Sequence, residues 1–111
     1  MREIDAQLLT KNIKEMCIEA NHYLAPDMLN VLNNARKNEK SPLGSQILEQ
    51  LDENLKIAAE DMIPICQDTG MAVVFMEIGQ DVHFVGGDLT DAINEGVRRG
   101  YDKGYLRKSV V

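Results

Sequence analysis

Four side chains able to do chemistry follow one another in this sequence: the thiol of Cys66, the amide of Gln67, the carboxylate of Asp68 and the hydroxyl of Thr69, just before Gly70. A thiolate is a metal ligand or a nucleophile, and a positioned carboxylate can take up or deliver a proton. Two interpretations are open at this point. The segment is a functional loop held by rigid elements, or it is an ordinary turn with a buried cysteine.

Proline and glycine mark the limits of this loop. Pro64 disfavours the helical conformation at Ile63, so the helix predicted upstream should end there. Gly70 tolerates backbone angles, or a close backbone approach, that a side chain would forbid. The loop therefore lies where a helical first half gives way to a second half that contains strands.

Three helices are predicted before the loop, because apolar residues recur there at spacings of three and four. The first runs from Asp5 to Leu24, the second begins at Pro26, and the third begins after Ser41, a favoured capping residue. Their predicted buried stripes are Leu9, Ile13, Met16, Cys17, Ala20 and Leu24 in the first, Met28, Val31, Leu32 and Ala35 in the second, and Leu43, Ile47, Leu48, Leu51, Leu55, Ala58 and Met62 in the third. Cys17 is thus interpreted as a small buried hydrophobe, and His22 as a structural residue at a helix end.

Strands are predicted after the loop. Met71 to Ile78 is short, apolar and β-branched, which is typical of a strand buried on both faces. Residues 79–81 resemble a hairpin turn, which leads into a second strand, Val82 to Val85. His83 is expected to point away from the core.

A fourth helix is predicted from Leu89 to about Tyr101, with Ala92, Gly96 and Gly100 four residues apart. Glycines inside a helix cost about 1 kcal/mol each against alanine. They are explained if this face lies against another backbone, and the alternative is a weak helix that bends. The predicted fold class is α+β: three N-terminal helices, a short β segment and a fourth helix, as part of a larger catalytic domain.

Composition excludes several classes of function. The chain has 111 residues, 44% of them hydrophobic and 27% charged, which is typical of one soluble globular domain. Its net charge of −6 and scattered basic residues argue against a nucleic-acid partner. The longest apolar run is too short to cross a membrane, and no secretion leader is evident. Only two cysteines are present, in surroundings that look intracellular, where reduced thiols are the default. The expected location is the cytoplasm.

The order of short motifs along nearly the whole chain resembles one enzyme family. The motifs are Cys-Ile-Glu-Ala-Asn, a Ser-Pro helix start, Pro-Ile-Cys-Gln-Asp-Thr-Gly, Gly-Gly-Asp, Ala-Ile-Asn-Glu-Gly-Val-Arg-Arg-Gly-Tyr and Leu-Arg-Lys-Ser-Val-Val. Together they resemble the N-terminal part of the α subunit of class I, iron–sulfur fumarate hydratases of the two-subunit kind. The α subunit of L(+)-tartrate dehydratase is a close relative of that family.

The resemblance implies a hydro-lyase of the tricarboxylic acid cycle that hydrates fumarate, a C4 dicarboxylate, to L-malate. It implies a 4Fe–4S cluster held by three cysteines, the first of which matches Cys66. Gln67 matches a residue that contacts the substrate carboxylate, and Asp68 one that binds substrate and takes part in proton transfer. Arg107 matches an arginine that binds a substrate carboxylate. A β subunit of the same enzyme is the implied partner.

The sequence departs from the family pattern because it offers one cluster ligand. Cys17 lies on a helix stripe, and no ligand spacing ties it to Cys66. We therefore expect residues 1–111 to be a truncated N-terminal part of the subunit domain, without a stable cluster or activity by itself. The apolar run from residue 71 to 78 and the small face of the last helix should be partly uncovered, so that a homo- or hetero-oligomer would hide them.

Two alternatives remain open on the sequence. One is the α subunit of a tartrate dehydratase, which shares the loop and differs in substrate. The other is a non-catalytic fold or interaction module that retains the loop without the cluster.

Overall fold

The computed structural model describes residues 1–66 and 68–108. Contacts divide the chain into two compact units. The sheet unit joins residues 1–19 to residues 68–108, and the hairpin unit comprises Ala20–Cys66. The chain crosses from one unit to the other inside the Cys66 loop.

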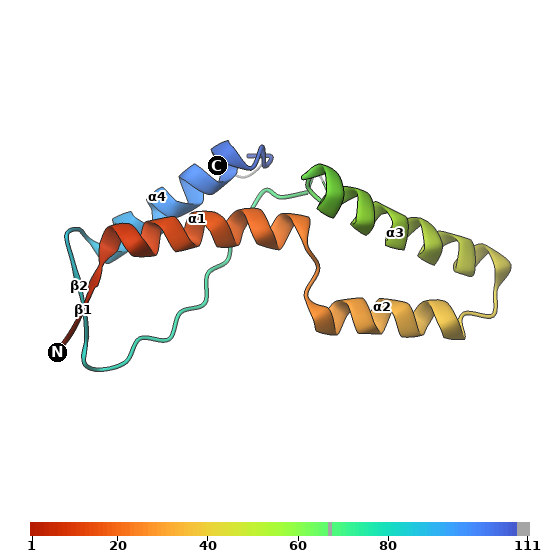
Figure 1. Cartoon of the computed structure of the whole chain (residues 1–111), viewed down its shortest axis with the longest axis horizontal. Helices are drawn as coiled ribbons and strands as arrows, with labels where there is room; N and C mark the ends of the chain where they lie inside the picture. Colours follow the sequence, from red (N-terminus) through yellow and green to blue (C-terminus); the bar gives the residue numbers. More distant parts are fainter. Residues whose placement is uncertain (67, 109–111) are drawn as a thin grey trace. The chain divides into compact units, whose positions relative to one another are not determined.

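The sheet unit contains two short parallel strands (Figure 1). Strand β1 (Arg2–Asp5) pairs with strand β2 (Val82–Val85), with Arg2 opposite Val82 and Asp5 opposite Val85. The N–H of Arg2 donates to the carbonyl of Asp81 at 2.7 Å, which fixes the first step of this register.

Helix α1 (Ala6–His22) and helix α4 (Leu89–Lys103) approach closely through two glycines. A Cβ added to Gly96 would lie 2.8 Å from the Cβ of Ile13, and one added to Gly100 would lie 2.8 Å from the Cβ of Cys17. Both glycines are buried. The prediction that this face of the last helix lies against another backbone is confirmed, and the expectation that it would be uncovered is wrong.

A buried hydrogen bond reinforces the same contact. The hydroxyl of Thr10 on α1 donates to the carbonyl of Ala92 on α4 at 2.8 Å. Thr10 is 5% exposed, so a donor without this acceptor would be buried at a cost of about 1–3 kcal/mol.

The outward face of α4 is charged. Glu95 accepts hydrogen bonds from Arg98 at 2.5 Å and from Arg99 at 2.8 Å. These bonds, first that from Arg98 and then that from Arg99, lower the pKa of Glu95 to about 2. The N-terminus of the helix is capped by the carboxylate of Asp88, which accepts from the N–H of Asp91 at 3.1 Å.

The predicted strand at residues 71–78 is wrong. This segment has no regular secondary structure and is exposed throughout, with Phe75 92% exposed. β2 pairs instead with the N-terminal residues 2–5, which the sequence placed before or within the first helix. The β segment therefore pairs the N-terminal residues with a strand far along the chain, so the local hairpin signal at residues 79–81 was misleading.

The hairpin unit contains α2 (Pro26–Asn38) and α3 (Pro42–Asp61), joined by a short loop. Ser41 caps α3, since its side chain accepts from the N–H of Gly44. The guanidinium of Arg36 lies 3.0 Å from the carboxylate of Asp52 and ties the two helices together. The predicted starts of both helices are confirmed.

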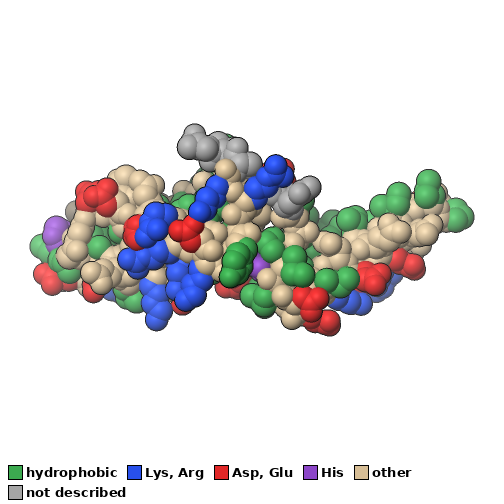
Figure 2. Space-filling view, turned by 90° about the horizontal axis from the view of Figure 1, so that it is seen from above, with side chains coloured by type: hydrophobic (Ala, Val, Ile, Leu, Met, Phe, Trp, Pro, Cys, Tyr) green, Lys and Arg blue, Asp and Glu red, His purple; other side chains and the backbone are tan. Residues whose placement is uncertain are grey.

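Burial in these two helices is lower than predicted. No residue of α2 is buried, and in α3 only Ala58 is buried. Two paired helices cover the seam between them, so the outer part of each apolar stripe stays at the surface: Leu43 is 67% exposed and Val31 is 59% exposed. Hydrophobic side chains accordingly lie at the surface among charged ones (Figure 2).

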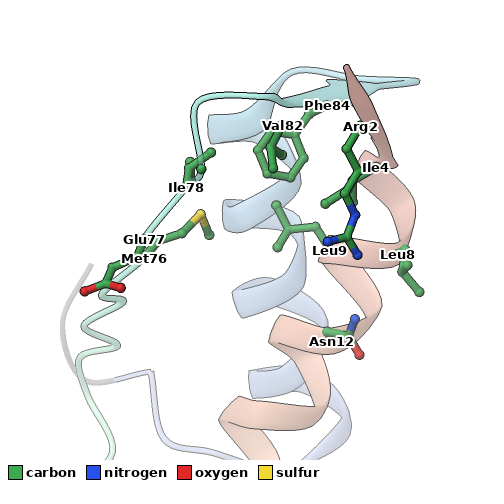
Figure 3. Close-up of a pocket in the computed structure, with 11 residues that line it drawn as sticks. Arg2, Ile4, Leu8, Leu9, Asn12, Met76, Glu77, Ile78, Val82 and Phe84 are labelled. Carbon is green, nitrogen blue, oxygen red and sulfur yellow. The ribbon is translucent and has the colours of Figure 1, made fainter.

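An apolar groove of about 570 Å³ lies beside the sheet (Figure 3). Ile4, Leu9, Val82 and Phe84 contribute to its lining, as do residues 76–79. No described helix is long and apolar enough to cross a membrane.

The glycine contact leads to a stability prediction. Gly96→Ala gains helix propensity but forces a Cβ against Ile13 and the Thr10 carbonyl, so it should lower the free energy of unfolding by about 1–2 kcal/mol. Gly44→Ala is the matched control, because its Cβ would meet the flexible side chain of Glu39 at the same 2.8 Å. We expect the control to lose no stability, because it gains the same helix propensity and the Glu39 side chain can move aside. Thermal unfolding followed by circular dichroism compares the two, and equal losses would contradict the backbone contact.

Candidate functional site

Thr69 anchors the second half of the loop inside the sheet unit. Its side-chain oxygen accepts from the N–H of Arg107 at 2.7 Å and donates to the carbonyl of Arg107 at 3.1 Å. Thr69 is 6% exposed. One buried hydroxyl thus satisfies both backbone groups of the arginine that the sequence analysis singled out.

Tyr101 holds the same threonine from the other side. Its hydroxyl donates to the carbonyl of Thr69 at 2.5 Å, and its ring is buried at the end of α4. Burial, and secondarily the neighbouring Cys17 thiolate, raise the pKa of Tyr101. The phenol therefore stays protonated, as a donor, at neutral pH.

The segment after α4 is shaped to present Arg107. Tyr105 adopts a left-handed backbone conformation with φ 55°, which is uncommon for a bulky residue. The chain turns there so that Leu106 is 4% exposed, and the N–H of Leu106 donates to the Tyr101 carbonyl at 3.0 Å. Lys108 pairs with Asp102 and lowers the pKa of that carboxyl. Arg107 is thus flanked by a buried side chain and an ion pair.

Asp68 and Arg107 are brought together by these contacts. Asp68 immediately precedes Thr69, and the Thr69–Arg107 hydrogen bonds place the two Cα atoms within about 10 Å of each other. Both side chains are exposed. Two of the predicted substrate-handling residues, 39 positions apart in the sequence (107 − 68), therefore share one small region of the sheet unit.

Cys66 is presented by the hairpin unit. The residue before it, Ile65, donates its N–H to the carbonyl of Asn21 at 2.7 Å, and its carbonyl accepts from the side chain of Asn54 at 2.9 Å. Cys66 itself is exposed. The interpretation of the loop as a turn with a buried cysteine is therefore wrong for this thiol.

The remaining candidates fall elsewhere. Gln67 lies outside the described residues. Cys17 is half-buried on α1, and burial raises the pKa of its thiol. His22 is 2% exposed, and its Nε2 lies 3.2 Å from the Met62 carbonyl, which confirms a structural role. His83 is exposed, as predicted.

Within residues 1–66 and 68–108, no three His, Cys, Asp or Glu side chains gather in a way that could hold a metal ion.

The sequence analysis missed the residues that hold the loop. Thr69 appeared only as one of four chemically capable residues, and Tyr101 only as the approximate end of the predicted fourth helix. Asn54 sits on α3, and nothing in its local pattern indicated that it caps the Ile65 carbonyl. All three bond to backbone groups distant in sequence, and such partners leave no periodic signal.

Comparison with known proteins gives consistent matches. The family model described as fumarate hydratase (Fumerase) matches residues 10–111. "Putative L(+)-tartrate dehydratase subunit alpha" of Methanocaldococcus jannaschii is 37% identical over 100 residues, which are 89% of this chain and 35% of that protein. In Escherichia coli K12, the anaerobic class I fumarate hydratase is 37% identical over 71 residues (64% of this chain, 13% of that protein), and the aerobic one is 38% identical over 74 residues (67% and 13%). The chain spans about a third or less of the length of these relatives.

The two cysteines should differ in reactivity. Cys17 is half-buried with a raised thiol pKa, so less of it is thiolate at pH 8, whereas Cys66 is exposed. We expect iodoacetamide to modify Cys66 about tenfold faster or more, and the alkylation of Cys17 to become faster only at higher pH. Peptide mass spectrometry after timed quenching measures both rates, and unfolding in urea should make them similar. Equal rates in the folded protein would contradict this placement of the thiols.

Proposed function

The chain belongs to the fumarate hydratase (Fumerase) family, and from this premise we propose that it is the N-terminal part of a hydro-lyase α subunit that hydrates fumarate to L-malate. In this proposal residues 1–111 form part of a larger catalytic domain. The matched relatives are named as hydratases and a dehydratase, which are hydro-lyases.

The observation that carries the proposal is the joining of Asp68 to Arg107 through Thr69. A dicarboxylate needs a cation for its carboxylate and an acid or base near the adjacent carbon. Arg107 offers a planar guanidinium that suits bidentate carboxylate binding. Asp68 offers the titratable group, and both side chains are exposed to a ligand.

The proposed division of labour follows from the reaction. In hydration the carbon–carbon double bond is lost as a hydroxyl adds to one carbon and a proton to its neighbour. We assign the movement of that proton to Asp68, which would deliver it in hydration and remove it in dehydration. Arg107 would hold the carboxylate so that the reacting carbon faces Asp68. Gln67 is proposed as a second contact to a substrate carboxylate.

Among the described residues, Cys66 fits one ligand position of the 4Fe–4S cluster that the family resemblance implies. Cys66 is exposed and would supply one thiolate, while the described residues contain no group of three metal-binding side chains. The other two ligands would come from further along the full-length subunit. When bound, such a cluster supplies a Lewis-acidic iron for the departing or arriving oxygen.

A partner subunit and a second candidate substrate follow from the archaeal relative. Its printed name is that of a subunit alpha, so we propose that this chain also assembles with a β subunit, in the cytoplasm. That relative is 37% identical over 100 residues and is named for L(+)-tartrate. Tartrate is therefore the second candidate substrate, and assays of the full-length protein with its partner on fumarate, malate and tartrate distinguish the two.

Asp68→Asn tests the proton-transfer role. Asparagine keeps the shape and the turn-forming hydrogen bonds but cannot ionise, so we expect kcat to fall at least about a hundredfold with cluster content near normal. Asp81→Asn, an exposed aspartate of the same unit, is the matched control and should leave kcat unchanged. Steady-state kinetics and iron analysis on the anaerobically prepared full-length enzyme give both numbers. Near-wild-type turnover of Asp68→Asn would show that Asp68 shapes the turn and does not transfer the proton.

Cys66→Ser and Cys17→Ala test the ligand assignment. Loss of the soft ligand at residue 66 should abolish cluster binding, whereas Cys17→Ala should cost about 1 kcal/mol of packing and leave the cluster in place. Iron and sulfide content of the two full-length variants decides between them. Equal loss in both would contradict the assignment of Cys66.

A further inference from the structure

Thr69 is hydrogen-bonded to the Arg107 segment in both directions. Its one hydroxyl both donates to and accepts from the backbone of Arg107, at 3.1 Å and 2.7 Å. The same residue accepts the Tyr101 hydroxyl on its carbonyl at 2.5 Å. Three hydrogen bonds therefore converge on the residue next to Asp68.

The contacts form a chain that runs from the helix pair to the loop. Gly100 seats α4 against α1, and Tyr101, the next residue, reaches from α4 to the Thr69 carbonyl. Thr69 in turn holds the backbone of Arg107. The buried groups of Thr69 and Tyr101 thereby fix the position of Thr69 relative to Arg107, 38 positions along the chain. The side chains of Asp68 and Arg107 remain exposed.

We propose that Thr69 is a positioning residue for the dicarboxylate site, supported by Tyr101, which sets the separation of Asp68 from Arg107. This inference rests on the proposed function, because it gives those two side chains one shared substrate. Small displacements of a bound substrate are costly in rate, with losses of about a hundredfold for misplacement by about 1 Å. A hydroxyl is required, since valine would keep the volume of threonine and lose all of the bonds to Arg107.

Thr69→Val in the full-length protein with its partner subunit is the test. We expect KM for the dicarboxylate to rise about tenfold or more, with a fall in kcat, because Arg107 and Asp68 no longer face one substrate together. Thr69→Ser keeps the hydroxyl and should restore KM to within about threefold of wild type. Tyr101→Phe should shift KM in the same direction by a smaller factor.

Thr10→Val is the matched control. Thr10 is 5% exposed and its hydroxyl also donates to a distant backbone carbonyl in the same unit, at 2.8 Å, but it is not in the loop. A purely structural role for Thr69 predicts that both valine variants lose stability alike and keep the wild-type KM. Of the two valine variants, positioning predicts a changed KM only in Thr69→Val.

The outcomes separate this inference from the function on which it rests. Wild-type enzyme that turns over none of fumarate, malate and tartrate would overturn the proposed function and this inference with it. Wild-type turnover with an unchanged KM in Thr69→Val and in Tyr101→Phe would overturn the positioning role alone. If Thr69→Val does not fold, Thr69→Ser and Tyr101→Phe still decide the question, since a raised KM in Tyr101→Phe with a normal KM in Thr69→Ser supports the proposal.

Discussion

The close approach of α1 and α4 is the constraint on which the rest of the sheet unit depends. Gly96 and Gly100 leave no room for a Cβ, so the two backbones pack at a distance that larger residues would not permit. This places Tyr101 where its hydroxyl reaches the Thr69 carbonyl. From there the hydrogen bonds extend to Arg107, so the geometry of the candidate site follows from a contact between helix backbones.

The Cys66 loop joins the two compact units in sequence. Ile65 is tied to α1 and α3 in the hairpin unit, and Thr69 is tied to the segment after α4 in the sheet unit. Each unit thus holds one end of the loop by its backbone. This arrangement suits a loop whose exposed side chains, Cys66 and Asp68, serve different chemical purposes in the proposed hydro-lyase.

Local pattern predicted the helices well and the β segment poorly. The starts of α2 and α3 were marked by Pro26 and by Ser41 with its following proline, each of which acts on neighbouring backbone groups. Pairing of β2 with residues 2–5 is a contact between distant segments, and a four-residue strand at the N-terminus carries too few residues to show alternation. The local pattern of residues 71–78 predicted a buried strand, and only the truncation expected from the family resemblance indicated that this run would be partly uncovered, because burial depends on which elements are available to cover an apolar run.

For the candidate site, the sequence by itself indicated which residues could do chemistry. The order Cys-Gln-Asp-Thr-Gly and the Leu-Arg-Lys-Ser motif identified the family and the candidate residues Cys66, Asp68 and Arg107, because chemical capability is a property of residue types. Only the tertiary structure decided that Asp68 and Arg107 are neighbours, that Cys66 is exposed while Cys17 is half-buried, and that Thr69 links the two segments. These facts depend on hydrogen bonds and burial between residues far apart in the chain, which no local sequence pattern records.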